Sequence, residues 1–371
     1  MKKRVVSFIA MIVLVFNLSG CFNYIEINKV TFATSVIFDE DELGNVILYL
    51  DCVRPYRNAG DSSDKGRRVI FKGKGKSSLE ALRDIDSASS NKLDLSQVRA
   101  YIFTEKCARA GIKKYIDVIN NDQKFSFKPY LFVYFGEVDP LLELTNGDEE
   151  YLGIYLDELV NKNKRNGKVI AENINEYIKD SLETSKISFM SSIRIKENAV
   201  NQDVELDGGV IMKDNHLIDV LDRNDVYYYN LLNNKVTEGT LQVTNPDEKN
   251  KFVTLDILEH YIKTNINIDN GKINVDKNIT LKVSIGEIQG KLEVNDTILS
   301  TIKINEEEKL KIALKNFYSK YEEKGIDILD IKRKVEQKYP KNEIEDILGN
   351  VNLNLNIDLL IDGSSLVKDR L

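Results

Sequence analysis

The chain has 371 residues, of which 42% are hydrophobic and 30% charged, and its formal net charge is −7. This length is enough for two or three domains of ordinary size. An acidic chain with scattered lysines is not expected to bind nucleic acid or to present a basic membrane-binding face.

The first segment has the layout of a bacterial secretory signal. Three basic residues at 2–4 precede an apolar run at 5–16, which is shorter than the roughly 20 residues needed to span a bilayer. The run leads into Leu-Ser-Gly-Cys, which resembles the lipobox of bacterial lipoproteins. Residues 1–20 are therefore predicted to be cleaved off, leaving Cys21 as the first residue with a diacylglyceryl group on its sulfur. The alternatives are an uncleaved short anchor, or a cysteine that lies by chance beside an ordinary cleavage site.

The predicted lipid would hold the mature chain firmly at a membrane. Each buried methylene contributes about 0.8 kcal/mol, and two acyl chains such as palmitate anchor a protein stably where one chain does not. Cleavage would remove three basic residues and no acidic ones, so the net charge would change from −7 to −10. No second run of about 18 apolar residues follows, so nothing else is expected to span a bilayer.

Strands and helices alternate over residues 31–135, which indicates a mixed α/β unit with at least one crossover connection. Three strands of a meander come first, followed by a helix that Ser77 or Ser78 caps. A strand, a helix with Ala110, Tyr115, Ile116 and Ile119 on its apolar side, and a central strand follow. The predicted ranges are 31–38, 45–53, 67–73, 77–89, 98–104, 107–121 and 129–135.

Residues 148–183 are predicted to be helical on either side of a polar, solvated joint at 161–168. Apolar side chains recur at helical spacing in both halves. Apolar density then falls at 190–205, so a domain boundary is expected near 195–205, between residues 21–197 and 203–371. The two apolar stripes are Leu152, Tyr155, Leu156 and Leu159, and Ile170, Ile174, Tyr177, Ile178 and Leu182.

The C-terminal half is predicted to be a largely antiparallel sheet with a packed helix pair. A strand–turn unit opens it, and Asp269-Asn270-Gly271 provides a tight turn. Asn305 is expected to cap a helix that Gly325 ends, with Leu310, Leu314, Phe317 and Tyr321 as its apolar stripe. The predicted strands are 251–257, 261–268, 277–285 and 351–361, and the second helix lies within 327–340. The fold class is therefore α+β.

No catalytic, metal or cofactor site is recognisable in the sequence. The stretch at 73–78, Gly-Lys-Gly-Lys-Ser-Ser, lacks the first glycine of a phosphate-binding loop, because Ile70 occupies that place. His216 and His260 have no partner at metal-ligand spacing. The segment 226–232, Val-Tyr-Tyr-Tyr-Asn-Leu-Leu, suits either an aromatic ligand platform or buried core, and core is the favoured interpretation.

Beyond Cys21 the chain contains two cysteines, Cys52 and Cys107. Two thiols in an exported chain can pair in a disulfide. Cys52 lies on the alternating apolar face of its strand, so a buried free thiol is the favoured interpretation.

Several segments together resemble the Ger(x)C family, the C-type lipoprotein subunits of bacterial spore germinant receptors. One is the start "LSGCFNYIEINKVTFATSVIFDEDELGN", and others are "GKGKSSLEALRDI", "DGGVIMKDNHLIDVLDRND" and "DNGKINVDKNITLKVSIGEI". The family's usual Trp-Asp-x-x-Glu is Phe-Asn-Tyr-Ile-Glu here, so Asn23 lacks the expected carboxylate. Only Cys21 carries over from the family, as the lipid attachment site.

The resemblance implies a lipoprotein on the outer face of the spore inner membrane that acts with two integral-membrane subunits. It implies no enzymatic activity and no cofactor, and leaves open whether this subunit contacts a small nutrient ligand. Two other classes share such an anchor: a solute-binding lipoprotein of an importer and a wall enzyme. An importer's solute-binding lipoprotein usually has two similar α/β lobes, and this sequence shows no such repetition. A wall enzyme needs a set of catalytic residues, and this sequence shows none.

Overall fold

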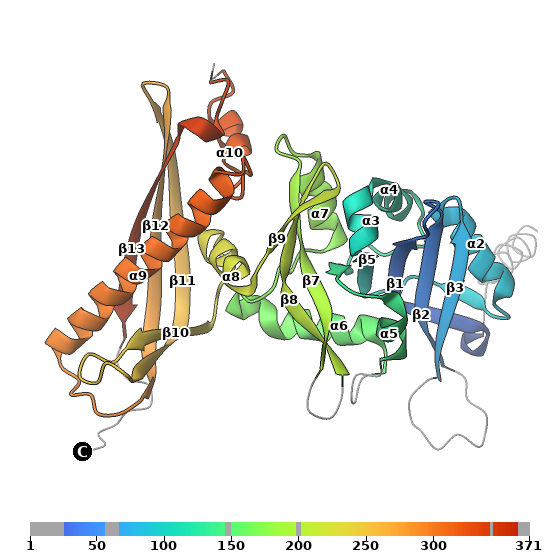
Figure 1. Ribbon diagram of the computed structural model, residues 1–371, viewed down its shortest axis with the longest axis horizontal. Helices are drawn as coiled ribbons and strands as arrows, with labels where there is room; N and C mark the ends of the chain where they lie inside the picture. The colour runs from blue at the N-terminus through green and yellow to red at the C-terminus, as the bar shows by residue number, and fades with distance from the viewer. Residues whose placement is uncertain (1–25, 56–66, 145–149, 198–201, 342–343, 363–371) are drawn as a thin grey trace, which may run out of the picture.

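The computed structural model describes residues 26–55, 67–144, 150–197, 202–341 and 344–362, so the predicted signal and Cys21 lie outside the described residues. The molecule is elongated, with one sheet in each half and a short helix, α8, between them (Figure 1). The mixture of helices and strands confirms the predicted α+β class.

Among the described residues, the N-terminal sheet contains nine strands, of which eight form a continuous path in the order β3-β2-β1-β5-β6-β7-β8-β9. The predicted meander is confirmed, since β1, β2 and β3 pair antiparallel. The crossover connections are present as well, because β1, β5, β6 and β7 run parallel. The strands are β1 Val30–Glu40, β2 Val46–Arg54, β3 Arg67–Gly75, β4 Lys92–Asp94, β5 Ala100–Thr104, β6 Tyr130–Tyr134, β7 Ile187–Glu197, β8 Gln202–Lys213 and β9 His216–Leu221.

Helices cover both faces of this sheet, which explains why β5 is buried along its whole length. On one face α2, α3, α4 and α7 pack against residues such as Phe38 and Phe103. On the other face α5 and α6 pack against Ile37 and Ile102. The helices are α2 Ser78–Ala88, α3 Glu105–Ala110, α4 Lys113–Asn121, α5 Val138–Glu143, α6 Leu152–Asn163 and α7 Ile174–Leu182.

Two helix predictions in this half need correction. The single helix expected at 107–121 is broken at Gly111, whose φ of 107° does not fit a helix, and a Cβ there would approach Nε2 of His216 to 2.6 Å. Ala110, expected on its apolar side, is exposed as a result. Leu182, expected in an apolar stripe, lies in the last turn of α7 and is 80% exposed.

The C-terminal sheet has the order β10-β11-β12-β13. Its first three strands are antiparallel, and β13 adds parallel to β12. The two strands expected at 251–268 are one long strand, which continues through a bulge near Ile257. The strands are β10 Gly239–Thr244, β11 Phe252–Asp269, β12 Lys272–Ile288 and β13 Val351–Ile361, and the helices α9 Asp296–Glu322 and α10 Ile331–Lys338 accompany them.

Helix α9 begins at Asp296, nine residues before Asn305, so the prediction that Asn305 caps it was wrong. Asn295 caps it instead by accepting a hydrogen bond from the backbone of Ile298 at 3.0 Å. The first turns contain β-branched residues with weak helix preference, and burial of Ile302 against the sheet overrides that preference. The predicted apolar stripe from Leu310 to Tyr321 is buried, as expected.

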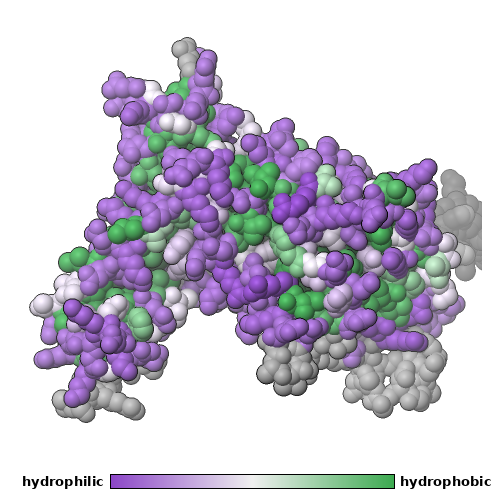
Figure 2. All heavy atoms as spheres, viewed as in Figure 1, coloured by the Kyte–Doolittle hydropathy of each residue, from purple (hydrophilic) through white to green (hydrophobic). Residues whose placement is uncertain are grey.

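The boundary expected at 195–205 falls between β7 and β8, which pair antiparallel from Ile187 with Lys213 to Glu197 with Gln202. The N-terminal sheet therefore continues across this region to β9. The second sheet begins only at Gly239. Figure 2 shows that the outer surface in view is mainly hydrophilic, with hydrophobic side chains in separate patches.

Candidate functional site

Helix α8, Arg223–Leu232, lies between the two sheets and joins their cores (Figure 1). Asp222 caps it by accepting a hydrogen bond from the backbone of Asp225 at 2.8 Å. Its buried apolar side chains belong to one cluster that runs from β7 into the C-terminal sheet. The interpretation of 226–232 as core is thus confirmed for Val226, Tyr229, Leu231 and Leu232, whereas Tyr227 and Tyr228 are half-buried.

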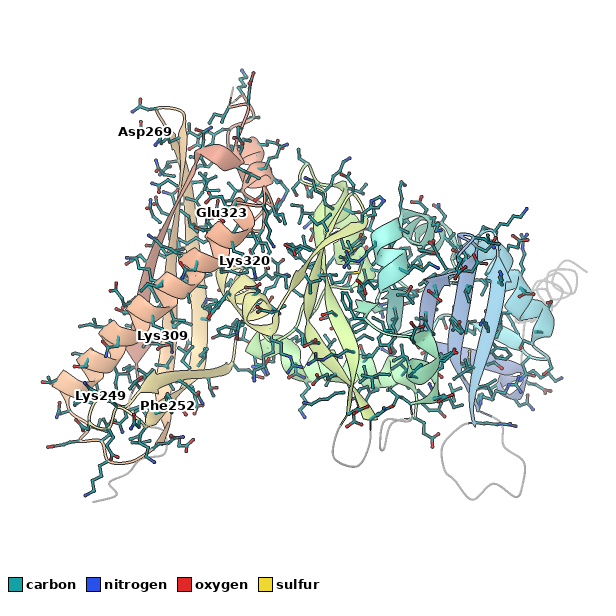
Figure 3. All side chains as sticks on the ribbon, in the orientation of Figure 1. Lys249, Phe252, Asp269, Lys309, Lys320 and Glu323 are labelled. Carbon is teal, nitrogen blue, oxygen red and sulfur yellow. The ribbon has the colours of Figure 1, made fainter. Side chains whose placement is uncertain are left out.

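Polar contacts fasten α8 to α9, and β9 to the turn that follows α9. The buried carboxylate of Asp225 accepts hydrogen bonds from the Tyr321 hydroxyl at 2.7 Å and from Nζ of Lys320 at 2.6 Å. Figure 3 shows Lys320 on the side of α9 that faces α8. A second ion pair joins Lys324 to Asp219. We call α8 and these partners the junction.

A second set of charges lies on the α7 side of α8. Glu172, which is 4% exposed, accepts hydrogen bonds from Lys235 at 3.0 Å and from the Tyr229 hydroxyl at 3.4 Å. Burial alone would lower the pKa of Lys235, but Tyr229 and Glu172 outweigh it and raise that pKa. Nearby, burial and then the charge of Glu172 raise the pKa of Asp180 to about 6. Through the buried Glu172, these contacts link the N-terminal half to α8 and to the exposed Lys235 that follows it.

A groove of about 620 Å³ opens beside α8, between α6, β8 and β10. Leu159, Val204 and Leu206 contribute apolar walls, together with the rings of Tyr155 and Tyr227. Hydrogen bonding fixes one wall, because the Tyr155 hydroxyl donates to the carbonyl of Val204 at 2.9 Å. We call this hollow the junction groove.

Glu205 on the groove wall and Asp207, two positions further along β8, are paired with cations. Glu205 contacts Arg194 at 2.9 Å, Arg223 at 2.8 Å and Lys196 at 3.3 Å. Asp207 contacts the same two arginines at 3.1 and 3.0 Å. Partial burial alone would raise the pKa of Glu205, but the hydrogen bonds from these cations lower it. The Glu205 carboxylate is therefore held ionised, and the charges of Glu205 and Asp207 are both compensated within the protein.

Two family models cover most of the chain. One, described as the spore germination protein N-terminal domain, matches residues 23–195. The other, described as spore germination B3/GerAC like, C-terminal, matches residues 207–365. The chain belongs to the GerAC-like family of spore germination proteins.

Individual relatives agree with this assignment. The chain is 23% identical over 235 residues to a spore germination protein GerQC of Bacillus cereus, and this match covers 63% of each chain. It also resembles the crystal structure of the GerBC protein, with a TM-score of 0.54 at 15% sequence identity. That likeness covers 88% of this chain and 96% of the GerBC chain, and it shows that the two share a fold.

The site residues considered in the sequence lie apart from one another in this member of the GerAC-like family. The imidazole of His216 contacts the carbonyl of Asp214 at 2.8 Å, and that of His260 contacts the carbonyl of Val236 at 3.1 Å. Burial lowers the pKa of His260. Within the described ranges, no group of three or more His, Cys, Asp or Glu residues could hold a metal ion.

The remaining predictions concern the cysteines and the glycine-rich turn. Cys52 and Cys107 are both buried and free, which confirms the favoured interpretation. Residues 73–78 end β3 and begin α2, where Ser77 accepts a hydrogen bond from the backbone of Glu80. This stretch is therefore a turn before a capped helix. In the part of the chain that the structure describes, no helix is long and apolar enough to cross a membrane.

Sequence reasoning did not identify the junction groove. The segment 161–168 was expected to be a solvated joint, and its lysines are indeed exposed, yet Lys168 also lines the groove. One signal was present, since acidic residues alternate at 203, 205 and 207 and basic ones at 194 and 196. This alternation indicated a charged face of the sheet, but it did not indicate that helix α8 lies beside that face.

Proposed function

We propose that this protein is the lipid-anchored, non-enzymatic subunit of a spore nutrient-germinant receptor. The observation that carries the proposal is the match of both halves, residues 23–195 and 207–365, to models of spore germination proteins. The lipobox ending at Cys21 supports an anchor in the spore inner membrane, with the body on its outer face. The names of the GerQC and GerBC proteins agree with a role in germination.

In this proposal the protein acts beside two integral-membrane subunits. A lipid on Cys21 confines the protein to two dimensions and raises its effective concentration near them. The junction supports a relay role, because its apolar core and the ion pair between the buried Asp225 carboxylate and Lys320 couple the two sheets mechanically. A displacement at one sheet would therefore reach the other rather than be absorbed by a flexible linker.

Spores that lack the protein test the proposal. They should fail to germinate with the nutrients that this receptor recognises, and still germinate with a trigger that acts downstream of receptors. A strain without sister receptors is needed, because these could substitute for the missing subunit. An unchanged nutrient response in that strain would overturn the assignment. Impaired solute uptake by growing cells would instead place the protein with the importer lipoproteins.

A further inference from the structure

The C-terminal sheet ends in a long edge strand, β13, beyond which the described part of the chain places no further strand. It is last in the order β10-β11-β12-β13 and lies on the side of the sheet away from α8 (Figure 1). All eleven of its residues pair with β12 in continuous register, without a bulge. It contains no proline, lysine or arginine. These are the usual devices that keep an edge strand from pairing with another chain, so β13 is open to pairing.

The opposite edge of the same sheet is covered by side chains. Nζ of Lys309 on α9 donates to the carbonyl of Gln242 on β10 at 2.7 Å. Beyond β10, the carbonyl of Ile266 on β11 accepts hydrogen bonds from Nζ of Lys338 at 2.6 Å and from the Tyr339 hydroxyl at 3.2 Å. Side chains of α9 and of the end of α10 therefore satisfy that edge.

At β13 the described residues provide a single side-chain contact of this kind. Glu307 accepts a hydrogen bond from the backbone N–H of Leu359 at 2.7 Å. The backbone of Asp362 donates to the carbonyl of Val283 on β12 at 2.8 Å, so even-numbered residues turn their backbone groups toward β12. Odd-numbered residues turn theirs outward, because these directions alternate along a strand. Leu353, Leu355 and Ile357 thus present a row of backbone donors and acceptors at the open edge.

The sequence of this edge is complementary to itself. When two copies of the strand run antiparallel with Leu355 opposite Leu355, each side chain faces one of its own class, and no two like charges meet. The outer face then pairs amides with amides or with a carboxylate, and amide groups both donate and accept. The resulting pairs are Val351 with Leu359, Asn352 with Asp358, Leu353 with Ile357, and Asn354 with Asn356.

Two further contacts fit a second copy. The amides of Asn352 and Asn354 each donate one hydrogen bond to β12, at 3.0 and 2.9 Å, which fixes their orientation and leaves a second N–H for a partner. Ile304 on α9 is 61% exposed, although it is an i,i+3 neighbour of the edge-contacting Glu307. This apolar side chain therefore lies on the flank of α9 that a second copy would approach.

We propose that β13 pairs antiparallel with β13 of a second copy of this chain, with Leu355 on the two-fold axis. The pairing is isologous, so it closes after two copies and produces a dimer rather than a fibre. The two C-terminal sheets become one continuous sheet, with both α9 helices on the same face. This proposal does not depend on the receptor role, because pairing is a property of the purified chain.

Disulfide cross-linking of the purified full-length chain in detergent tests the pairing and its register. Asn354 and Asn356 face each other across the axis in a pair that is not hydrogen-bonded, where Cα atoms lie about 4.5 Å apart, within disulfide range. A mixture of Asn354→Cys and Asn356→Cys chains should therefore cross-link at least about fivefold faster than either variant alone. Tyr261→Cys, on the exposed outer face of β11 two strands from the edge, should not cross-link.

Sedimentation equilibrium over a concentration series measures the dimer itself. We expect the wild type to form dimers, and Asn354→Lys/Asn356→Lys to weaken them about tenfold, because lysines then face lysines across the axis. Both substituted side chains are exposed, so this variant should fold normally. Tyr261→Lys/Asn267→Lys adds the same charge to the same face of the sheet, away from the edge, and should leave the dimer unchanged.

Three results would overturn the proposal. A monomeric wild type would do so and would leave the edge to a strand from another protein. A dimer that Asn354→Lys/Asn356→Lys does not weaken would place the contact elsewhere on the surface. Equal cross-linking in the mixture and in the single variants would exclude this register. None of these results changes the germination phenotype of the deletion, so the two proposals are separable.

Discussion

The hydroxyl of Tyr321 lies 2.7 Å from the carboxylate of Asp225 and donates a hydrogen bond to it across 96 positions of sequence. Lys320 donates to the same carboxylate oxygen at 2.6 Å. Burial, followed by the hydrogen bond to Asp225 and its charge, raises the pKa of Tyr321, so its hydroxyl remains protonated. This contact joins the connecting helix α8 to the long helix α9 and is the basis of the first prediction.

Tyr321→Phe should loosen the junction without unfolding either sheet. The change removes one donor from a buried carboxylate, and hydrogen bonds to charged groups contribute about 1.5–3 kcal/mol. We expect faster amide hydrogen exchange in α8 and in the facing part of α9. Tyr227→Phe is the matched control, since its hydroxyl has no described partner. Exchange in α8 at the wild-type rate would show that the contact does not hold the junction.

The buried Lys277 should make stability depend on pH. It is 3% exposed, and its Nζ donates to the carbonyl of Leu232 at the C-terminal end of α8, at 2.8 Å. Burial lowers its pKa from 10.5 to about 7, and the charge of Lys334 contributes in the same direction. Between these pH values the folded state holds fewer protons than the unfolded state, so stability should rise with pH by up to about 1.4 kcal/mol per unit.

Urea unfolding of the full chain from pH 6 to 10 measures this dependence. Lys277→Met should reduce the slope between pH 7 and 10 and raise stability at neutral pH, since it removes the buried charge. Lys263→Met, on the exposed face of the neighbouring strand, should leave the slope unchanged. An equal slope in the wild type and in Lys277→Met would mean that Lys277 titrates normally in the folded protein.

The two buried cysteines should be unreactive until the protein unfolds. Cys52 and Cys107 are both 0% exposed, and burial raises the pKa of each thiol, so little thiolate forms. A thiol reagent should therefore label neither in native buffer and both in urea. Absence of labelling in urea without reductant would indicate a disulfide. A third reactive thiol in urea would indicate that Cys21 carries no lipid.

Cys21→Ala should abolish fatty-acid labelling and release the protein from the membrane fraction. The prediction follows from the lipobox, because the cysteine sulfur is the attachment point and two acyl chains provide the anchoring. The same variant should share part of the germination defect of the deletion, since the released protein loses its local concentration. A variant that is still labelled and still sediments with membranes would show that the lipoprotein assignment is wrong.

Limited proteolysis tests how separate the two predicted domains are. We propose that cleavage within residues 195–205 leaves fragments that remain associated. The reason is that β7 and β8, on either side, pair from Ile187 with Lys213 to Glu197 with Gln202. The fragments should therefore elute together in gel filtration and separate only in denaturant. Fragments that separate in native buffer would instead indicate independent domains.

The sequence alone determined those features that depend on near neighbours. Alternating and helical spacings identified most strands and helices, because burial on one face requires side chains at periods of 2.0 or 3.6 residues. The Gly-Lys-Gly-Lys-Ser-Ser stretch was correctly interpreted as a turn before a capped helix, since a serine cap acts within three residues. The family resemblance was readable for the same reason, as it rests on contiguous strings, whereas the signal segment remains a prediction.

Features that depend on residues far apart in sequence were decided only by the tertiary structure. Helix α9 starts at Asp296 because Ile302 is buried against a sheet, and Gly111 breaks a helix where His216 from a distant strand approaches. The junction groove combines α6, β8, α8 and β10, and the Asp225 carboxylate meets Tyr321 across 96 positions. Periodicity tells which face of an element is apolar, but packing of whole elements decides what that face meets.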